Sequence, residues 1–133
     1  MKEMTAALII EDRKLLVVHN IKHGLRIEPP GGKKEDGETL EDCVIREVRE
    51  ELRIDIKILE LFGVYKTNSP EGNFRVSMYL SKISGGAPEI QETNKHSKFE
   101  WCDYSSLENY KQQNYLVRNL CEALPKLRSL DYI

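Results

Sequence analysis

The sequence predicts an α+β domain in which a mixed β-sheet supplies most of the core. Strand-like runs outnumber helical ones, and most of them are joined by turns rather than by helices. The length of 133 residues favours a single domain, residues 1–133, that can bury its own core. Hydrophobic residues make up 40% and charged residues 32%, as in globular proteins, and no apolar run is long enough to span a bilayer.

The N-terminal part is predicted to hold two strands and an irregular segment. Residues 4–10 and 14–19 are aliphatic and β-branched runs separated by a short charged turn. The stretch Pro29-Pro30-Gly31-Gly32 is expected to exclude regular structure.

A helix is predicted from Thr39 to Leu52, where apolar residues recur at helical spacing. Thr39 has the side chain of an N-cap residue, and Asp42, three residues later, completes an imperfect capping box.

The remainder is predicted to form a long hairpin, a short strand and a terminal helix. Runs 54–67 and 74–83 have strand character, and the segment between them is rich in turn formers. Residues 99–102 are a short strand candidate. Apolar residues then repeat at helical spacing, at Leu116, Leu120, Ala123, Leu124 and Leu127.

Charge and composition argue against several classes of protein. Twenty Lys and Arg against 22 Asp and Glu give a net charge of -2, so neither a nucleic-acid polymer nor an anionic membrane is an expected partner. The apolar stretch near the start is too short for a secretory signal, which predicts a cytoplasmic location.

Neither a disulfide framework nor a zinc site is expected from Cys43, Cys102 and Cys121. Surface or sheet-edge positions are expected for His19, His23 and His96.

The predicted helix carries three carboxylates along one border of its buried face. At about 100° per residue, Glu47, Glu50 and Glu51 fall within an arc of roughly 100°, while Arg46 and Arg49 take the opposite side, where solvent is expected. Three adjacent acids repel one another and resist desolvation unless a cation lies among them. Oxygen ligands favour Mg²⁺ or Mn²⁺, and Mg²⁺ is commonly shared with substrate phosphates, so the pattern indicates phosphate chemistry.

The segment before the helix could complete such a site. The pair Gly31-Gly32 allows the backbone to approach a ligand or metal closely. Glu38 can fold back onto Arg46. Lys33 could contact phosphates, with a solvated loop position as the equal alternative.

The spacing of these residues resembles the signature of the MutT/Nudix hydrolases, G-x5-E-x7-R-E-U-x-E-E-x-G-U, where U is aliphatic. The matching positions are Gly32, Glu38, Arg46, Glu47, Val48, Glu50, Glu51 and Ile54. Arg53 departs from the pattern, because the family has a glycine there that fits a left-handed helix end. A solvated helix with i,i+4 ion pairs would explain an isolated acidic run but not this spacing.

The resemblance implies an α/β/α sandwich with a mixed, largely hairpin-linked sheet, and an enzyme that uses Mg²⁺ or Mn²⁺. The ion would be held, directly or through water, by the Gly31 carbonyl, Glu47, Glu50 and Glu51. Arg46 and Glu38 would orient the glutamates. Substrate contacts are expected from Gly32, Lys33 and Arg26.

Two positions are open for the general base. Glu92 begins a segment similar to the E-P-x-K and W-x-W motifs of MutT-like nucleoside triphosphatases, with Thr93 in place of the proline and Phe99 in place of the first tryptophan. A glutamate of the helix, Glu47 first, is the alternative.

The resemblance implies hydrolysis of a nucleoside diphosphate linked to another group. A MutT-like enzyme, which releases pyrophosphate and a monophosphate from a nucleoside triphosphate, is the first expectation. An ADP-ribose or dinucleotide pyrophosphatase is the alternative, because residues 61–65 and 86–89 are similar to stretches of archaeal and bacterial members. A noncatalytic nucleotide-sensing domain is disfavoured because it need not retain three costly acids. The expected partner is a small-molecule nucleotide, bound by a monomer or homodimer.

Overall fold

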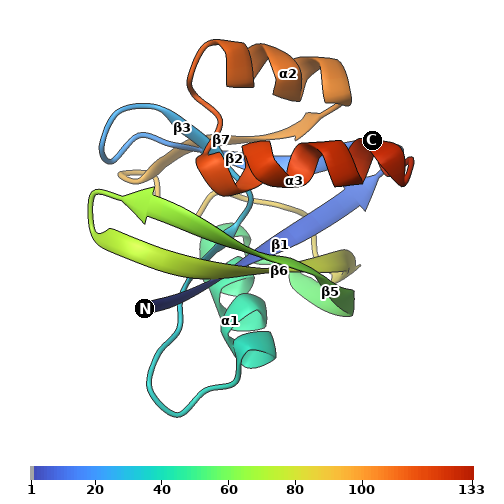
Figure 1. The fold of residues 1–133 in the computed structure, drawn as a ribbon. Coiled ribbons are helices and arrows are strands. Elements are labelled where there is room, and N and C mark those ends of the chain that lie inside the picture. Colours follow the sequence, from blue (N-terminus) through green and yellow to red (C-terminus); the bar gives the residue numbers. More distant parts are fainter. Residues whose placement is uncertain (1) are drawn as a thin grey trace.

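The computed structural model describes residues 2–133, in which seven strands and three helices are present (Figure 1). In chain order these elements are β1 (Lys2–Glu11), β2 (Lys14–Asn20), β3 (Arg26–Glu28), β4 (Gly31–Lys33), α1 (Leu40–Leu52), β5 (Asp55–Ser69), β6 (Gly72–Gly85), β7 (His96–Cys102), α2 (Tyr104–Gln112) and α3 (Arg118–Ser129).

Strand β1 connects the two parts of the sheet. Its first eight residues run parallel to β6, with Lys2 opposite Phe74 and Ile9 opposite Ser81. Its other edge pairs antiparallel with β4, and its last residues pair with β2. Strand β2 pairs in turn with β3 and β7, and β6 pairs with β5 in a long antiparallel hairpin. The predicted mixed, hairpin-rich sheet is therefore confirmed.

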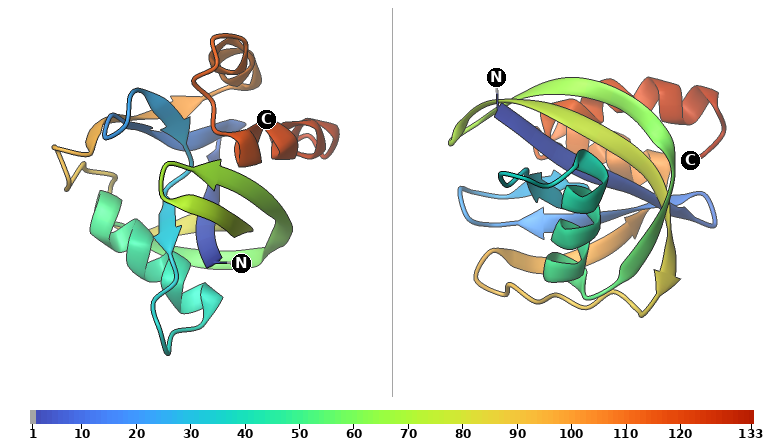
Figure 2. Two further views of the ribbon diagram at one scale, coloured as in Figure 1. Left: turned by 60° about the vertical axis from the view of Figure 1, so that its left-hand side comes forward. Right: turned by 90° about the horizontal axis from the view of Figure 1, so that it is seen from below.

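Helices cover both faces of the strands. Helix α1 lies on one side and helices α2 and α3 lie on the other, as Figures 1 and 2 show. One apolar cluster joins Leu8, Met78 and Leu124, and a second joins Ile9, Val48 and Tyr79. Because adjacent residues of β1 contribute to opposite clusters, the strand is buried on both faces. This arrangement is the expected α/β/α sandwich.

Local sequence signals placed α1 and the hairpin correctly. The Thr39 hydroxyl accepts a hydrogen bond of 3.1 Å from the backbone N–H of Asp42, and the helix ends at Leu52. The β5–β6 register runs from Asp55–Gly85 to Ser69–Gly72. Both features depend on caps and turns that short stretches of sequence encode.

Other elements differ from expectation. Residues 31–33 form β4 although the stretch from Pro29 to Gly32 was expected to exclude regular structure, because β1 supplies the pairing partner. Strand β7 starts at His96 rather than at residue 99. Helix α2 was not predicted; it begins after Asp103, whose carboxylate accepts a 2.9 Å hydrogen bond from the N–H of Ser106. The terminal helix α3 is confirmed and starts at Arg118.

Arg53 ends α1 in the left-handed conformation, with φ 57° and ψ 35°. Since this conformation costs a side chain about 1 kcal/mol and suits glycine, Arg53→Gly is expected to raise the free energy of unfolding by a few tenths to about 1 kcal/mol. Denaturant unfolding checks this, with Arg53→Ala as the control that keeps the Cβ and removes the weak contact with Glu89. A lower midpoint for Arg53→Gly than for wild type, at unchanged m-value, would contradict the prediction.

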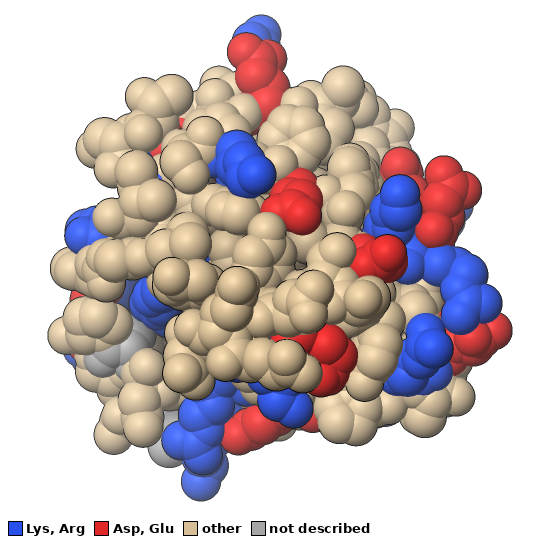
Figure 3. Space-filling model, turned by 90° about the horizontal axis from the view of Figure 1, so that it is seen from above, with Lys and Arg blue, Asp and Glu red and all other residues tan. Residues whose placement is uncertain are grey.

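No helix of residues 2–133 is long and apolar enough to cross a membrane. On the face drawn in Figure 3, Lys and Arg side chains lie among Asp and Glu side chains rather than in one continuous stripe. That face lacks the pattern typical of a surface for nucleic-acid polymers.

Candidate active site

Glu51 is a buried carboxylate in the last turn of α1, with only 2% of its surface exposed. Its Oε1 accepts a 2.7 Å hydrogen bond from the backbone N–H of Gly31. Its Oε2 lies 3.7 Å from Lys95 Nζ and 3.3 Å from His96 Nε2. Burial raises the pKa of Glu51 well above its usual range. A cation beside Oε2 would stabilise the ionised form, as the sequence argument required.

Glu47 lies one turn earlier on α1 and packs against the backbone of Gly32. A Cβ atom at Gly32 would lie only 2.4 Å from the Glu47 carboxylate, so a side chain at this position would displace it. Burial raises the pKa of Glu47 as well. The double glycine thus brings the β4 backbone against two acids of α1.

Arg46 organises the acidic residues around it. Its guanidinium donates to Glu38 at 2.8 Å, to Glu47 at 2.9 Å and to Glu50 at 3.2 Å. These contacts leave the Arg46 side chain 24% exposed, which corrects the expectation that it points to solvent. The long side chain bends toward Glu38 in the loop before α1, and this bond lowers the pKa of Glu38 to about 2.

Glu92 lies one helical turn before His96, which is the first residue of β7. The carbonyl of Glu92 accepts hydrogen bonds from the N–H groups of Lys95 and His96, at 2.9 and 2.8 Å. This turn places potential ligand atoms of Glu92, His96 and Glu51 within 4.8 Å of one another. The expected surface or edge position of His96 is wrong, because its side chain is fully buried. Burial lowers the pKa of His96 to about 4, so the ring is neutral near pH 7.

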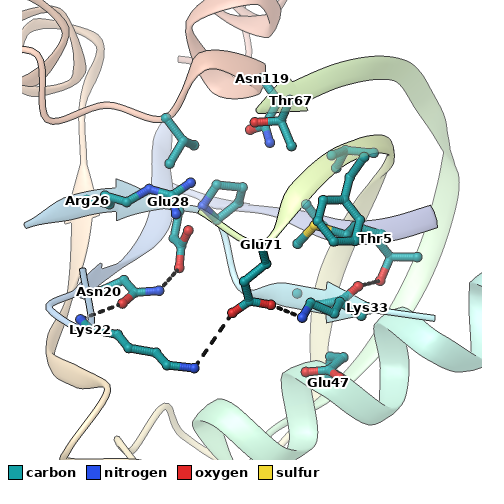
Figure 4. A pocket seen from close by; sticks show the side chains of 18 of the residues that line it. Thr5, Asn20, Lys22, Arg26, Glu28, Lys33, Glu47, Thr67, Glu71 and Asn119 are labelled. Carbon is teal, nitrogen blue, oxygen red and sulfur yellow. Dashed lines mark hydrogen bonds and ion pairs between the residues drawn. The ribbon is translucent and has the colours of Figure 1, made fainter. Parts of the chain in front are cut away.

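A pocket of about 280 Å³ opens beside these acids (Figure 4). Gly31, Gly32 and Glu47 line it near α1, and the predicted substrate residues Arg26 and Lys33 line it as well. Five of the ten site residues that the sequence singled out therefore line this pocket, whereas Glu38, Arg46, Glu50, Glu51 and Glu92 do not line it. Glu50 is more peripheral, with a side chain that is 55% exposed.

The tip of the β5–β6 hairpin reaches over this pocket. The carboxylate of Glu71 contacts Lys33 and lies 3.6 Å from Lys22, and Figure 4 shows it between the two lysines. A carboxylate thus neutralises two cations that could otherwise meet a phosphate.

Several pocket residues were missed from the sequence. Glu28 accepts a 2.7 Å hydrogen bond from Asn20, and burial raises its pKa. At the other end of the pocket, Thr67 Oγ1 and Asn119 Oδ1 are buried without a hydrogen-bond partner. These residues come from β3, β2, β5 and α3, and no motif links elements so far apart in sequence. His96, which lies beside Glu51 and was also missed, differs from these residues because it had a local signal in the sequence, namely its i,i+4 spacing from Glu92.

The residues that the sequence assigned to the metal have suitable donor atoms, but among the described residues the group whose ligand atoms lie within 4.8 Å of one another is Glu51, Glu92 and His96. Carboxylate oxygens of Glu47, Glu50 and Glu51 and the Gly31 carbonyl are ligands that Mg²⁺ and Mn²⁺ accept. Burial raises the pKa of the Glu51 carboxyl, and a cation beside it would oppose this effect.

Comparison with known proteins agrees with the geometry. A family model described as the NUDIX domain matches residues 1–120. The chain belongs to the Nudix hydrolase family. Divalent metals are general cofactors of Nudix hydrolases, and their substrates are small nucleotides.

Relatives of this Nudix hydrolase differ in their named activities. A MutT-like protein of Streptomyces ambofaciens is 33% identical, over 96% of this chain and 82% of its own length. An ADP-ribose pyrophosphatase of Methanocaldococcus jannaschii is 29% identical over 69% of this chain, and the match spans 57% of that enzyme. The crystal structure of a MutT protein from Methanosarcina mazei shares the fold, with a TM-score of 0.82 at 16% identity over 98% of this chain and 94% of the other.

Proposed function

We propose that this Nudix hydrolase cleaves a nucleoside triphosphate to a nucleoside monophosphate and pyrophosphate. One observation carries the proposal: a single pocket, which Glu47 of α1 lines, also contains the unpartnered buried atoms of Thr67 and Asn119. The acidic end suits a metal-bound phosphate chain, and the other end offers hydrogen-bonding atoms to a nucleobase. The volume of about 280 Å³ is slightly smaller than is usual for small-molecule pockets, which favours one nucleoside over two.

The proposed reaction is attack of water on phosphorus, without a covalent intermediate. The Gly31 carbonyl, Glu47, Glu50 and Glu51 would hold the divalent ion, which neutralises phosphate charge and makes water more acidic. Arg46 keeps Glu47 and Glu50 in place through its hydrogen bonds.

Glu92 is proposed to accept the proton of the attacking water as the new O–P bond forms and the anhydride P–O bond breaks. The site places its carboxylate in the group with Glu51 and His96, and it remains partly exposed to solvent. Lys33 and Arg26 would contact the phosphates. Lys33 would then leave its ion pair with Glu71 and bind the substrate instead.

An ADP-ribose or dinucleotide pyrophosphatase is the second candidate, favoured by the name of the Methanocaldococcus relative. The two candidates differ in their products, because a triphosphate yields pyrophosphate and one monophosphate, whereas ADP-ribose yields two monophosphate esters. A screen of nucleoside triphosphates, ADP-ribose and dinucleotides, with Mg²⁺ or Mn²⁺ and identified products, decides between them. Binding of nucleotides without turnover of any of them would instead indicate a sensing domain.

Glu92→Gln is expected to lower kcat by roughly 10²-fold while leaving KM nearly unchanged, because it removes a base and retains a similar shape. Steady-state kinetics at saturating metal provide the measurement. Glu89→Gln is the matched control, since Glu89 lies in the same loop and its side chain is 66% exposed. A loss below tenfold for Glu92→Gln would move the base into α1, with Glu47 first in line.

A further inference from the structure

His96 has two ring nitrogens that are buried and have no hydrogen-bond partner within residues 2–133. Its side chain is completely inaccessible to solvent. Buried histidines ordinarily satisfy at least one nitrogen, because an unpaired polar atom in a dry environment is costly. The other buried histidine, His19, follows this rule, with Nε2 at 2.9 Å from Glu100 Oε1. His96 therefore lacks a partner that its surroundings would be expected to provide.

The unpartnered Nε2 of His96 faces the acidic site. It lies 3.3 Å from Glu51 Oε2, yet the pair does not have hydrogen-bond geometry. Two ligands that are each about 2.1 Å from one ion and 3.3 Å from each other subtend roughly 100° at that ion. This angle lies between those of octahedral and tetrahedral sites. The spacing thus suits two atoms that share a cation.

We propose that His96 Nε2 is a direct ligand of the divalent ion, next to Glu51, so that this site contains nitrogen as well as oxygen. The inference rests on the proposed metal-dependent function. Glu92 would reach the same ion through a water molecule, which agrees with its proposed role as base and with its place in the 4.8 Å group. The turn that pairs Glu92 with His96 fixes both side chains on one side of the chain.

Lys95 is a neighbour that opposes this arrangement. Its Nζ lies 3.7 Å from the same Oε2 of Glu51 and would repel a metal ion there. The side chain is 31% exposed and also lines the substrate pocket. A lysine with this freedom can turn toward the phosphates when the ion binds, which replaces one cation beside Glu51 with another.

A nitrogen ligand changes the expected choice of metal. Imidazole suits Co²⁺ and Zn²⁺ best and Mn²⁺ less well, whereas Mg²⁺ strongly prefers oxygen. His96→Gln should therefore weaken Co²⁺ binding by about tenfold or more, weaken Mn²⁺ binding by a smaller factor, and change Mg²⁺ affinity by less than about threefold. If His96 only supported Glu51, the substitution would change the affinities of all three ions to a similar extent. Titration calorimetry of each ion with wild type and His96→Gln measures these affinities.

Pulsed electron paramagnetic resonance of bound Mn²⁺ tests the contact directly. The sequence has three histidines, so ¹⁴N coupling of imidazole type must disappear in His96→Gln and persist in the His19→Gln and His23→Gln controls. Wild-type protein that binds Mn²⁺ without this coupling would overturn the inference and leave the proposed function intact. Absence of Mn²⁺ and Mg²⁺ binding to the wild type would overturn both.

The His96→Cys variant covers the case in which His96→Gln does not fold. A thiolate at this position should give a sulfur-to-Co²⁺ charge-transfer band that Co²⁺-loaded wild type lacks, although the wild type contains three cysteines. A folded variant that binds Co²⁺ without this band would reject His96 as a ligand.

Discussion

Glu51→Gln is expected to lose about 10²- to 10³-fold in metal-dependent kcat, because it removes a charged ligand from the proposed ion site. In the absence of metal the same variant is expected to be more stable than wild type, by about 1 kcal/mol. Glutamine retains an oxygen for the Gly31 N–H and removes a buried carboxylate whose pKa is raised by burial. Activity and metal-free stability should therefore change in opposite directions.

The pH dependence of this stability difference has a definite sign. Because the folded-state pKa of Glu51 lies above its unfolded value, the folded state binds the proton more tightly. The stabilisation that the protonated Glu51 carboxyl contributes to the wild type is complete below the unfolded-state pKa. It is lost as the pH rises through the folded-state pKa. The advantage of Glu51→Gln in chelator should grow from acidic to neutral pH, as measured by denaturant midpoints. Wild-type rates with Mg²⁺ in this variant, or reduced stability without metal at neutral pH, would contradict the prediction.

Gly31→Ala is expected to destabilise the fold by about 3 kcal/mol or more. A Cβ atom at this position would lie 2.1 Å from the carbonyl oxygen of Thr5 and 2.7 Å from the Cα of Ala6. Both are backbone atoms of β1, so relief requires β4 to move away from the strand that holds it. That movement would also remove the hydrogen bond from Gly31 to Glu51.

Gly37→Ala provides the matched control for Gly31→Ala. Gly37 has a φ of +84° and no atom within 4 Å of an added Cβ, so its substitution tests conformational strain without collision. We expect a cost of about 1 kcal/mol for this control. Both variants are measured by denaturant unfolding. If they lose the same free energy of unfolding, β4 can move away from β1 at little cost, and the prediction for Gly31→Ala is contradicted.

Local signals account for the parts of the site that the sequence predicted. The placement of Glu47 and Glu51 followed from helical spacing, since the apolar residues define the buried face of α1. Arg46 was placed correctly by spacing but given the wrong surroundings, because a helix projection omits the loop that carries Glu38. Angular position alone does not determine where a long side chain ends.

The remaining features depend on pairing between distant segments. Residues 31–33 became a strand because β1 lies beside them, and His96 is buried because β7 pairs with β2. Thr67 and Asn119 meet in the pocket only after β5 and α3 have been brought together by the sheet and its core. Turn and helix propensities carry no information about such contacts.

The double pairing of β1 also determines when the metal site can exist during folding. The strand contributes none of the proposed ligands, but it holds β4 beside α1 and pairs with β6, about 70 positions further along the chain. Contacts between such distant segments form slowly because a long loop must close first. A chain emerging from synthesis has its α1 carboxylates long before β6 and the Glu92–His96 turn. Metal affinity should therefore appear late in refolding, after helix formation, and its time course would report on completion of the sheet.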